Sequence, residues 1–206
     1  MSWQPQRPPF ADFKKTVFKK AGAAAEFVYQ IGEYEQLRKP SQEVPIKSIT
    51  SPDFKAKVAY LKDCLRNYRN LTGYGRGITA VQVGIPERFS VIFTQDGLLI
   101  VINPTITKKS QKLLLYPEIC MSANPVIAPT VRPAWIEFDY YDEQGNLQHW
   151  KTKDNTDKGE IMNRVFQHEI DHMEGIINID RVRDPKELIL ESRPDYYHTA
   201  KFEEVK

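Results

Sequence analysis

The sequence has few cysteines and no long apolar run. Its two cysteines, Cys64 and Cys120, lie far apart among 206 residues, which excludes the dense disulfide framework of small secreted domains and favours a reducing compartment. No stretch approaches the roughly 20 apolar residues that cross a bilayer, and the N-terminus lacks the pattern of a secretory signal. We therefore expect a cytoplasmic protein with no membrane partner.

A strong charge of one sign is also missing. The 29 Lys and Arg residues nearly balance the 27 Asp and Glu residues, so the net charge is +2 and the composition does not call for a specific nucleic acid partner. A chain of 206 residues can bury its own core, and we expect one domain over residues 1–206. Residues 1–30 and 184–206 are predicted to be extensions of that domain.

The first 30 residues carry a local basic bias. Their excess of lysine and arginine resembles a transit peptide, so a mitochondrion or plastid is kept as an alternative location. A packed helix is the favoured interpretation, and its lysines are expected to form a solvated face in preference to a contact with ribosomal RNA. Four apolar residues recur there at helical spacing: Phe10, Phe13, Val17 and Ala21.

A helix is predicted from Ser48 to Asn70, where Ser51 can cap the first turn and Pro52 suits its start. The pattern then becomes that of strands. Phe89 to Thr94 and Leu98 to Ile102 flank a connection with an Asp-Gly pair, which favours a hairpin. Asn103-Pro104 is expected to end the second of these strands, because proline cannot donate to a ladder.

A second hairpin is predicted from Trp135 to Tyr141 and from Leu147 to Lys151, where apolar and polar residues alternate. Helical spacing returns from Lys158 to Glu174, and Gly175 suits the end of that helix. Both of its faces carry apolar residues, so it should be central. The order of elements predicts an α+β fold, with antiparallel sheets around this central helix.

The central helix contains the strongest chemical signal, His168-Glu169-Ile170-Asp171-His172. Residues four apart on a helix stand one turn above each other, so His168 and His172 can offer two imidazoles to one metal. Glu169 would then lie beside the metal. Only four histidines occur in the chain, and two of them fall in this pattern, which makes coincidence a poor explanation.

A catalytic site of this kind usually has a third protein ligand and an open position for water. Cys120 is one candidate, because a thiolate binds zinc or ferrous iron strongly. Glu191, nineteen residues after His172, is the other, since some zinc proteases use a downstream glutamate. Composition and spacing leave both open, because an isolated cysteine is more often a small buried apolar residue.

Three segments together resemble the peptide deformylase family. They are GRGITAVQVG at Gly75 to Gly84, EICMS at Glu118 to Ser122 and QHEIDHMEG at Gln167 to Gly175. Weaker similarity extends the resemblance over residues 31–183. The motifs occur in the family's order, and the resemblance implies hydrolysis of the formyl group from the N-terminal methionine of new proteins.

The resemblance also implies the roles of individual residues. Cys120, His168 and His172 would bind one divalent metal, ferrous iron in nature, which zinc, nickel or cobalt can replace. The metal would lower the pKa of a water molecule, and Glu169 would take the proton of that water and pass it to the leaving amine. Negative charge on the formyl oxygen would be stabilised by the Gln82 side-chain amide and the Met121 backbone N–H.

Further residues are assigned to the substrate and to support of the metal ligands. Gly75, Arg76 and Gly77 offer a backbone stretch beside which a peptide can add as a strand. The remaining candidates are Ile161, Val165 and Glu118 for the substrate, with Arg132, Asp171 and again Glu118 to orient the histidines. Ile161 and Val165 have an equally good interpretation as ordinary core residues.

Two positions depart from the family's usual motifs. Thr79 stands where alanine is usual, and Ile119 stands where glycine usually precedes the cysteine. A β-branched residue cannot adopt glycine-only backbone angles cheaply, so the backbone at Ile119 is expected to differ from the family or the pocket to be narrower.

Two other functions compete with the deformylase. A zinc endopeptidase that uses Glu191 would tolerate Cys120→Ala, whereas a deformylase would lose its metal. A deformylase-like protein without activity could instead bind peptides or make transient contact with the ribosome. The intact set of metal ligands and Glu169 favours the enzyme.

Overall fold

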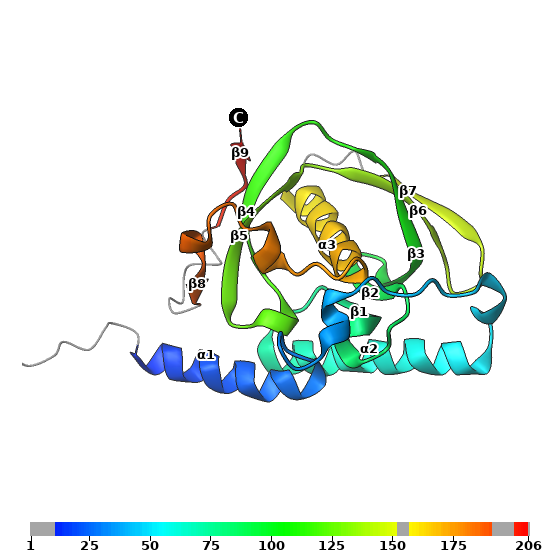
Figure 1. Cartoon of the computed structure of the whole chain (residues 1–206), viewed down its shortest axis with the longest axis horizontal. Helices are drawn as coiled ribbons and strands as arrows, with labels where there is room; N and C mark the ends of the chain where they lie inside the picture. The colour runs from blue at the N-terminus through cyan, green and yellow to red at the C-terminus, as the bar shows by residue number, and fades with distance from the viewer. Residues whose placement is uncertain (1–10, 152–156, 191–199, 206) are drawn as a thin grey trace, which may run out of the picture.

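Two antiparallel sheets enclose one helix in the computed structural model of the protein, which describes residues 11–151, 157–190 and 200–205. The three α-helices are α1 (Ala11–Ala24), α2 (Pro52–Thr72) and α3 (Asp157–Met173). Helix α3 runs between the sheets, while α1 and α2 lie along the base of the molecule in the view of Figure 1. This arrangement confirms the predicted α+β fold with a central helix that carries both histidines.

One sheet has five strands and the other has four. The five-stranded sheet has the order β1 (Gly77–Thr79), β2 (Phe89–Thr94), β3 (Gly97–Lys109), β6 (Ile136–Tyr141) and β7 (Leu147–Lys151). The four-stranded sheet has the order β8 (Ile189–Leu190), β5 (Val126–Pro133), β4 (Leu113–Ile119) and β9 (Glu203–Val205). Strands β1 and β7 therefore form the two edges of the larger sheet.

Helix α2 begins at the predicted cap and first turn, and it ends two residues beyond the predicted Asn70. The Ser51 side chain accepts a hydrogen bond from the Phe54 N–H, a cap that contributes about 1 kcal/mol, and Pro52 occupies the first turn. Gly73, with φ of 80°, ends the helix in the left-handed conformation. An apolar stripe along the helix is buried: Phe54, Val58, Leu61, Leu65 and Tyr68.

Strand β2 of the five-stranded sheet is buried on both faces, because its side chains alternate between two helices. Phe89 and Val91 of β2 pack into the cluster that contains the α2 stripe, whereas Ile92 packs into a cluster with Phe166 and Ile170 of α3. Both predicted hairpins are present, as β2 with β3 and as β6 with β7. The sheet thus fixes α3 relative to α2.

The prediction that Asn103-Pro104 ends its strand is wrong, because β3 continues to Lys109. Pairing with β6 shifts register between Ile102 and Thr105, so the proline falls where the ladder is irregular. Asn103 adopts a φ of 49°, and its side chain bonds to both the N–H and the C=O of Val44. These side-chain bonds tie the segment at Val44 to the irregular part of β3.

Helix α3 ends at Met173, and Gly175 follows with φ of 75°. A Cβ on Gly175 would lie 2.6 Å from the Arg38 carbonyl carbon, so both the backbone angle and the space demand glycine. The predicted helix and its stop are confirmed within one residue.

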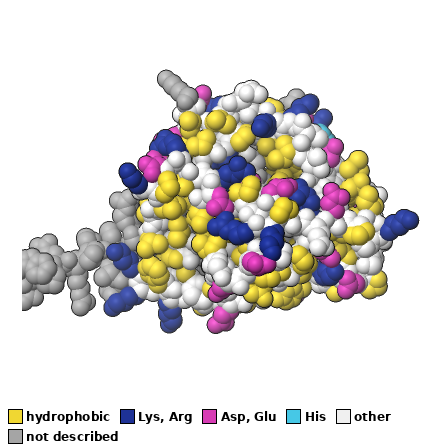
Figure 2. Space-filling model, viewed as in Figure 1, with side chains coloured by type: hydrophobic (Ala, Val, Ile, Leu, Met, Phe, Trp, Pro, Cys, Tyr) yellow, Lys and Arg dark blue, Asp and Glu magenta, His cyan; other side chains and the backbone are white. Residues whose placement is uncertain are grey.

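The first helix and the last strand among the described residues pack on the body. Helix α1 contacts α2, and its Ala21 is buried, while its Phe18 is 47% exposed. Phe10 lies outside the described residues. Strand β9 near the C-terminus pairs with β4. Charged side chains of both signs are spread over the face seen in Figure 2, as the near-neutral composition suggests. Among the described residues, no helix is long and apolar enough to span a membrane.

Candidate metal centre

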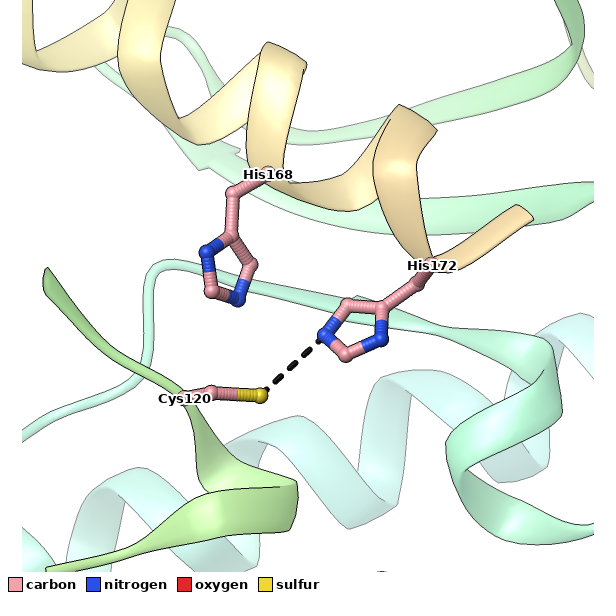
Figure 3. A group of neighbouring side chains, drawn as sticks. All are labelled: Cys120, His168 and His172. Carbon is pink, nitrogen blue, oxygen red and sulfur yellow. Dashed lines mark hydrogen bonds between the residues drawn. The ribbon is translucent and has the colours of Figure 1, made fainter. Parts of the chain in front are cut away.

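Three ligand atoms converge where the end of β4 meets α3. Cys120 follows β4 and begins the short 3₁₀ helix η5 (Met121–Ala123), and the rings of His168 and His172 project from α3 toward its sulfur (Figure 3). One ligand atom from each residue lies within 4.8 Å of the other two, and Cys120 Sγ is 3.2 Å from His172 Nε2. The structure thus brings together the predicted metal ligands.

The donor set fits a divalent metal. Metal–sulfur and metal–nitrogen bonds of about 2.3 and 2.0 Å in a tetrahedron place the ligand atoms roughly 3.3 to 3.6 Å apart, and the 3.2 Å between Cys120 Sγ and His172 Nε2 is close to this range. Burial and the neighbouring His168 hold the pKa of His172 well below its usual range, so that ring is neutral and has a lone pair to offer. A thiolate and two imidazoles leave one tetrahedral position free.

Glu118 orients the first histidine. Its Oε2 lies 3.0 Å from His168 Nδ1, and its side chain is 5% exposed. Burial alone would raise the pKa of the Glu118 carboxyl, but Arg132, the His168 contact and Arg164 together hold that pKa well below its usual range. An ionised carboxylate can only accept hydrogen bonds, so His168 Nδ1 carries a proton and Nε2 is the ring nitrogen left to bind a metal.

Glu118 belongs to a buried network of charges. Arg132 Nε donates to Glu118 Oε1 at 2.7 Å, and Arg132 Nη1 donates to Asp171 Oδ2 at 2.6 Å. Arg164 Nη1 donates to Glu118 at 2.8 Å, and Arg181 Nη2 donates to Asp171 at 2.7 Å. The predicted support by Glu118, Arg132 and Asp171 is consistent with these contacts. With both carboxylate oxygens engaged inside the protein, a substrate contact by Glu118 is not favoured.

Sequence reasoning missed Arg164 in this network. Its side chain is 7% exposed and also donates to the Thr130 carbonyl and hydroxyl and to the Leu114 carbonyl. The sequence did contain a signal for this role. Arg164 is a charged residue four positions before His168, on the same face of a largely buried helix. Arg164 therefore ties α3 to β4 and β5.

Glu169 lies against β1. Its Oε2 is 2.7 Å from Thr79 Oγ1, and the residue is 4% exposed. Burial raises the pKa of its carboxyl, against the opposing effects of His168 and Thr79. A Cβ on Gly77 would lie 2.5 Å from Glu169 Oε1, so the missing side chain of Gly77 makes room for this carboxylate. A raised pKa suits a group that both takes and returns a proton near neutral pH.

The two predicted oxyanion donors lie on segments that touch. Gln82, in the 3₁₀ helix η4 (Ala80–Val83), is 1% exposed, and its Nε2 donates to Ser122 Oγ at 3.0 Å. Its Oε1 accepts from the Thr79 N–H at 2.8 Å, which fixes the orientation of the amide. Ser122 directly follows Met121, so both donors are held beside Cys120.

The residues assigned to the substrate have mixed surroundings. Strand β1 is an edge of its sheet, as a peptide that adds a strand requires. The Arg76 carbonyl already accepts from the Phe93 N–H, and Gly75 has φ of 101°. Val165 packs against the core cluster around Phe138, which favours its interpretation as core, and Ile161 is half-buried. Glu191 lies outside the described residues.

Comparison with known sequences decides the family. The sequence model described as polypeptide deformylase matches residues 27–188. The chain belongs to the polypeptide deformylase family. This membership confirms the predicted resemblance, and it supports a metal-dependent hydrolase over the endopeptidase.

Individual deformylases agree with the match. The peptide deformylase of Prochlorococcus marinus (strain NATL2A) is 36% identical over 166 residues, which cover 78% of this chain and 75% of that protein. That of Picosynechococcus sp. is 38% identical over 124 residues, 58% of this chain, and the match spans 62% of that relative's length. The crystal structure of a Synechococcus elongatus peptide deformylase in complex with actinonin superposes with a TM-score of 0.64 at 27% identity and covers 76% of this chain and 78% of that one.

The two departures from the deformylase motifs have simple structural settings. Ile119 lies in β4 opposite Ile127, and the one non-glycine residue with positive φ in the described part of the chain is Asn103. Ile119 therefore has ordinary strand geometry and needs no glycine-only angles. Thr79 is buried, and its hydroxyl forms a hydrogen bond with the Glu169 carboxylate.

Proposed function

We propose that the chain hydrolyses the formyl group from N-terminal formylmethionine of nascent proteins, with Cys120, His168 and His172 as ligands of one divalent metal. The observation that carries this proposal is the convergence of one sulfur and two imidazole nitrogens beside the buried carboxylate of Glu169. Ferrous iron is the natural metal in this proposal, and zinc, nickel or cobalt can replace it.

A bound divalent ion supplies a Lewis acid that makes water a nucleophile near neutral pH. Glu169 takes the proton from the attacking water and delivers it to the amine nitrogen as the C–N bond breaks, so formate and a free N-terminus are released. Gln82 and the Met121 N–H donate to the formyl oxygen as it gains negative charge. Glu118 keeps His168 in the tautomer that binds metal, with Arg132 and Asp171 holding Glu118 in place.

The substrate is an extended peptide beside β1, where Gly75, Arg76 and Gly77 present their backbone at the sheet edge. Ile161 and Val165 stay candidates for the walls of the methionine pocket. The enzyme acts in the cytoplasm, or in a mitochondrion or plastid, with at most transient contact with the ribosome. Residues 1–30 and 184–206 are extensions of one domain.

Two alternative functions would require different sites. An endopeptidase that uses Glu191 in place of Cys120 is disfavoured by the 3.2 Å separation of Cys120 Sγ and His172 Nε2. A homologue that only binds peptide has no need for a buried carboxylate beside the metal ligands, because such a group is costly to maintain without a chemical role.

The test is hydrolysis of a formyl-Met peptide by protein purified anaerobically with ferrous iron. We expect Glu169→Gln to lose activity and keep its metal, and Cys120→Ala to lose both. Cys64→Ala is the matched control, because Cys64 is the chain's other buried cysteine and lies in the α2 core. A metal-loaded wild type without activity would favour the binding-only homologue, and metal retention by Cys120→Ala would favour the endopeptidase.

A further inference from the structure

Thr79 makes two contacts with Glu169, and both are buried. Its Oγ1 lies 2.7 Å from Glu169 Oε2 and 3.1 Å from the backbone carbonyl oxygen of Glu169. Thr79 is fully buried, so water does not compete for the hydroxyl. Alanine, the usual residue here in the motif that this chain resembles, would offer neither contact.

The hydroxyl completes a slot for the Glu169 side chain. Gly77 and Thr79 are two apart on β1, so they face the same side of the strand. At Gly77 the absence of a Cβ leaves room for the carboxylate, because an added Cβ would lie 2.5 Å from Oε1 and 2.8 Å from the carboxyl carbon. One residue thus provides the space and the other provides the polar contact.

A hydroxyl can keep this contact in every protonation state of the carboxyl group, because it both donates and accepts. It donates to Oε2 when Glu169 is ionised, or when the proton sits on Oε1. When the proton sits on Oε2, the acid donates to Thr79 Oγ1, and the hydroxyl turns its own hydrogen to the Glu169 carbonyl oxygen at 3.1 Å. The contact with the hydroxyl and the space at Gly77 together define one place for the side chain.

We propose that Thr79 is a positioning residue that holds Glu169 in one orientation throughout the reaction. The inference rests on the proposed function, in which Glu169 takes a proton from water and gives it to the leaving amine. A general base must stay within hydrogen-bond reach of the proton it moves, so a freed carboxylate would slow the proton transfers and leave substrate binding intact.

Thr79→Val tests this directly, since it replaces the hydroxyl with a methyl group of similar size. We expect kcat to fall roughly tenfold or more, with KM and metal content within about twofold of wild type. Thr79→Ser restores the hydroxyl and should recover most of the rate. Thr107→Val, an exposed threonine on β3, is the control for the same chemical change and should match wild type.

A second readout does not depend on activity. In a crystal structure of metal-free Thr79→Val we expect the Glu169 carboxylate to leave its place against Gly77, and in Thr79→Ser to keep it. An unchanged carboxylate position, or a wild-type kcat in Thr79→Val, overturns the role of Thr79. A wild type that does not hydrolyse formyl-Met peptides overturns the proposed function instead, and the crystal structures then still decide whether Thr79 positions Glu169.

Discussion

The Nδ1 atom of His168 lies 3.0 Å from Oε2 of Glu118, across 50 residues of sequence. This contact links a metal ligand to a carboxylate that is itself held by two arginines. A change in the network around Glu118 should therefore reach the metal, even where the altered residue does not touch it.

Arg132→Ala should cost both stability and metal. The Arg132 side chain is 4% exposed and bridges Glu118 and Asp171, so its loss leaves two buried carboxylates short of a partner, at a cost of about 3–5 kcal/mol. Thermal unfolding and metal content measure the two effects. Arg66→Ala removes an exposed ion pair with Asp63 and should change stability by less than about 1 kcal/mol. Equal behaviour of the two variants would show that Arg132 gives His168 no support.

Gly77→Ala should abolish activity at modest cost to folding. The new methyl group would occupy the place of the Glu169 carboxylate, which must move away to make room. Activity on a formyl-Met peptide and circular dichroism of the same sample separate the two effects. Gly22→Ala is the control, because a Cβ at Gly22 in α1 meets nothing within 4 Å. Full activity of Gly77→Ala would show that the carboxylate does not need its present position.

Zinc added to metal-free protein should raise the unfolding temperature and release protons, because the folded state binds the ion and the thiol must ionise. His172→Ala should remove the temperature shift. His149→Ala, at a half-exposed position on β7, should keep it. Calorimetry in two buffers of different ionisation enthalpy counts the protons. A zinc-dependent shift that survives in His172→Ala would place the metal elsewhere.

Phe202→Ala should loosen the C-terminal strand. The Phe202 ring stacks on Tyr116 with centroids 4.4 Å apart and lies 5.6 Å from the Arg164 guanidinium carbon. Together these contacts contribute about 1–2 kcal/mol. Chemical denaturation compares this variant with Phe18→Ala, because Phe18 on α1 is about half exposed, at 47%. An equal fall in the free energy of unfolding of both variants would show that the stacked ring of Phe202 stabilises the protein no more than the ring of Phe18 does.

The features predicted from sequence are those with a local cause. Ser51 caps α2 through a residue three positions away, and the two histidines share a face because they are one helical turn apart. The alternation in β6 and β7 reflects one buried face, so the second hairpin could be predicted. The α+β class followed from the order of these elements.

The features that sequence reasoning missed depend on tertiary contacts or on residues with a poor local signal. In β4 and β5, Pro117 lies opposite Pro129, and proline argues against a strand in any local analysis. The bonds of Arg164 to Glu118 and of Asn103 to Val44 join distant segments. Thr79 was noticed as a departure from a motif, but its partner Glu169 is 90 residues away and only the fold brings them together.

The origin of the ligands on different elements also sets when the chain can acquire its ion. Cys120 and His172 are 52 residues apart, and they meet only after the four-stranded sheet has docked on α3. The entropy of closing that loop is lost when the chain folds. A chain emerging from the ribosome would therefore lack the complete set of metal ligands until α3 has packed beside Cys120. The fraction of the protein that holds metal then measures the fraction of chains that have folded.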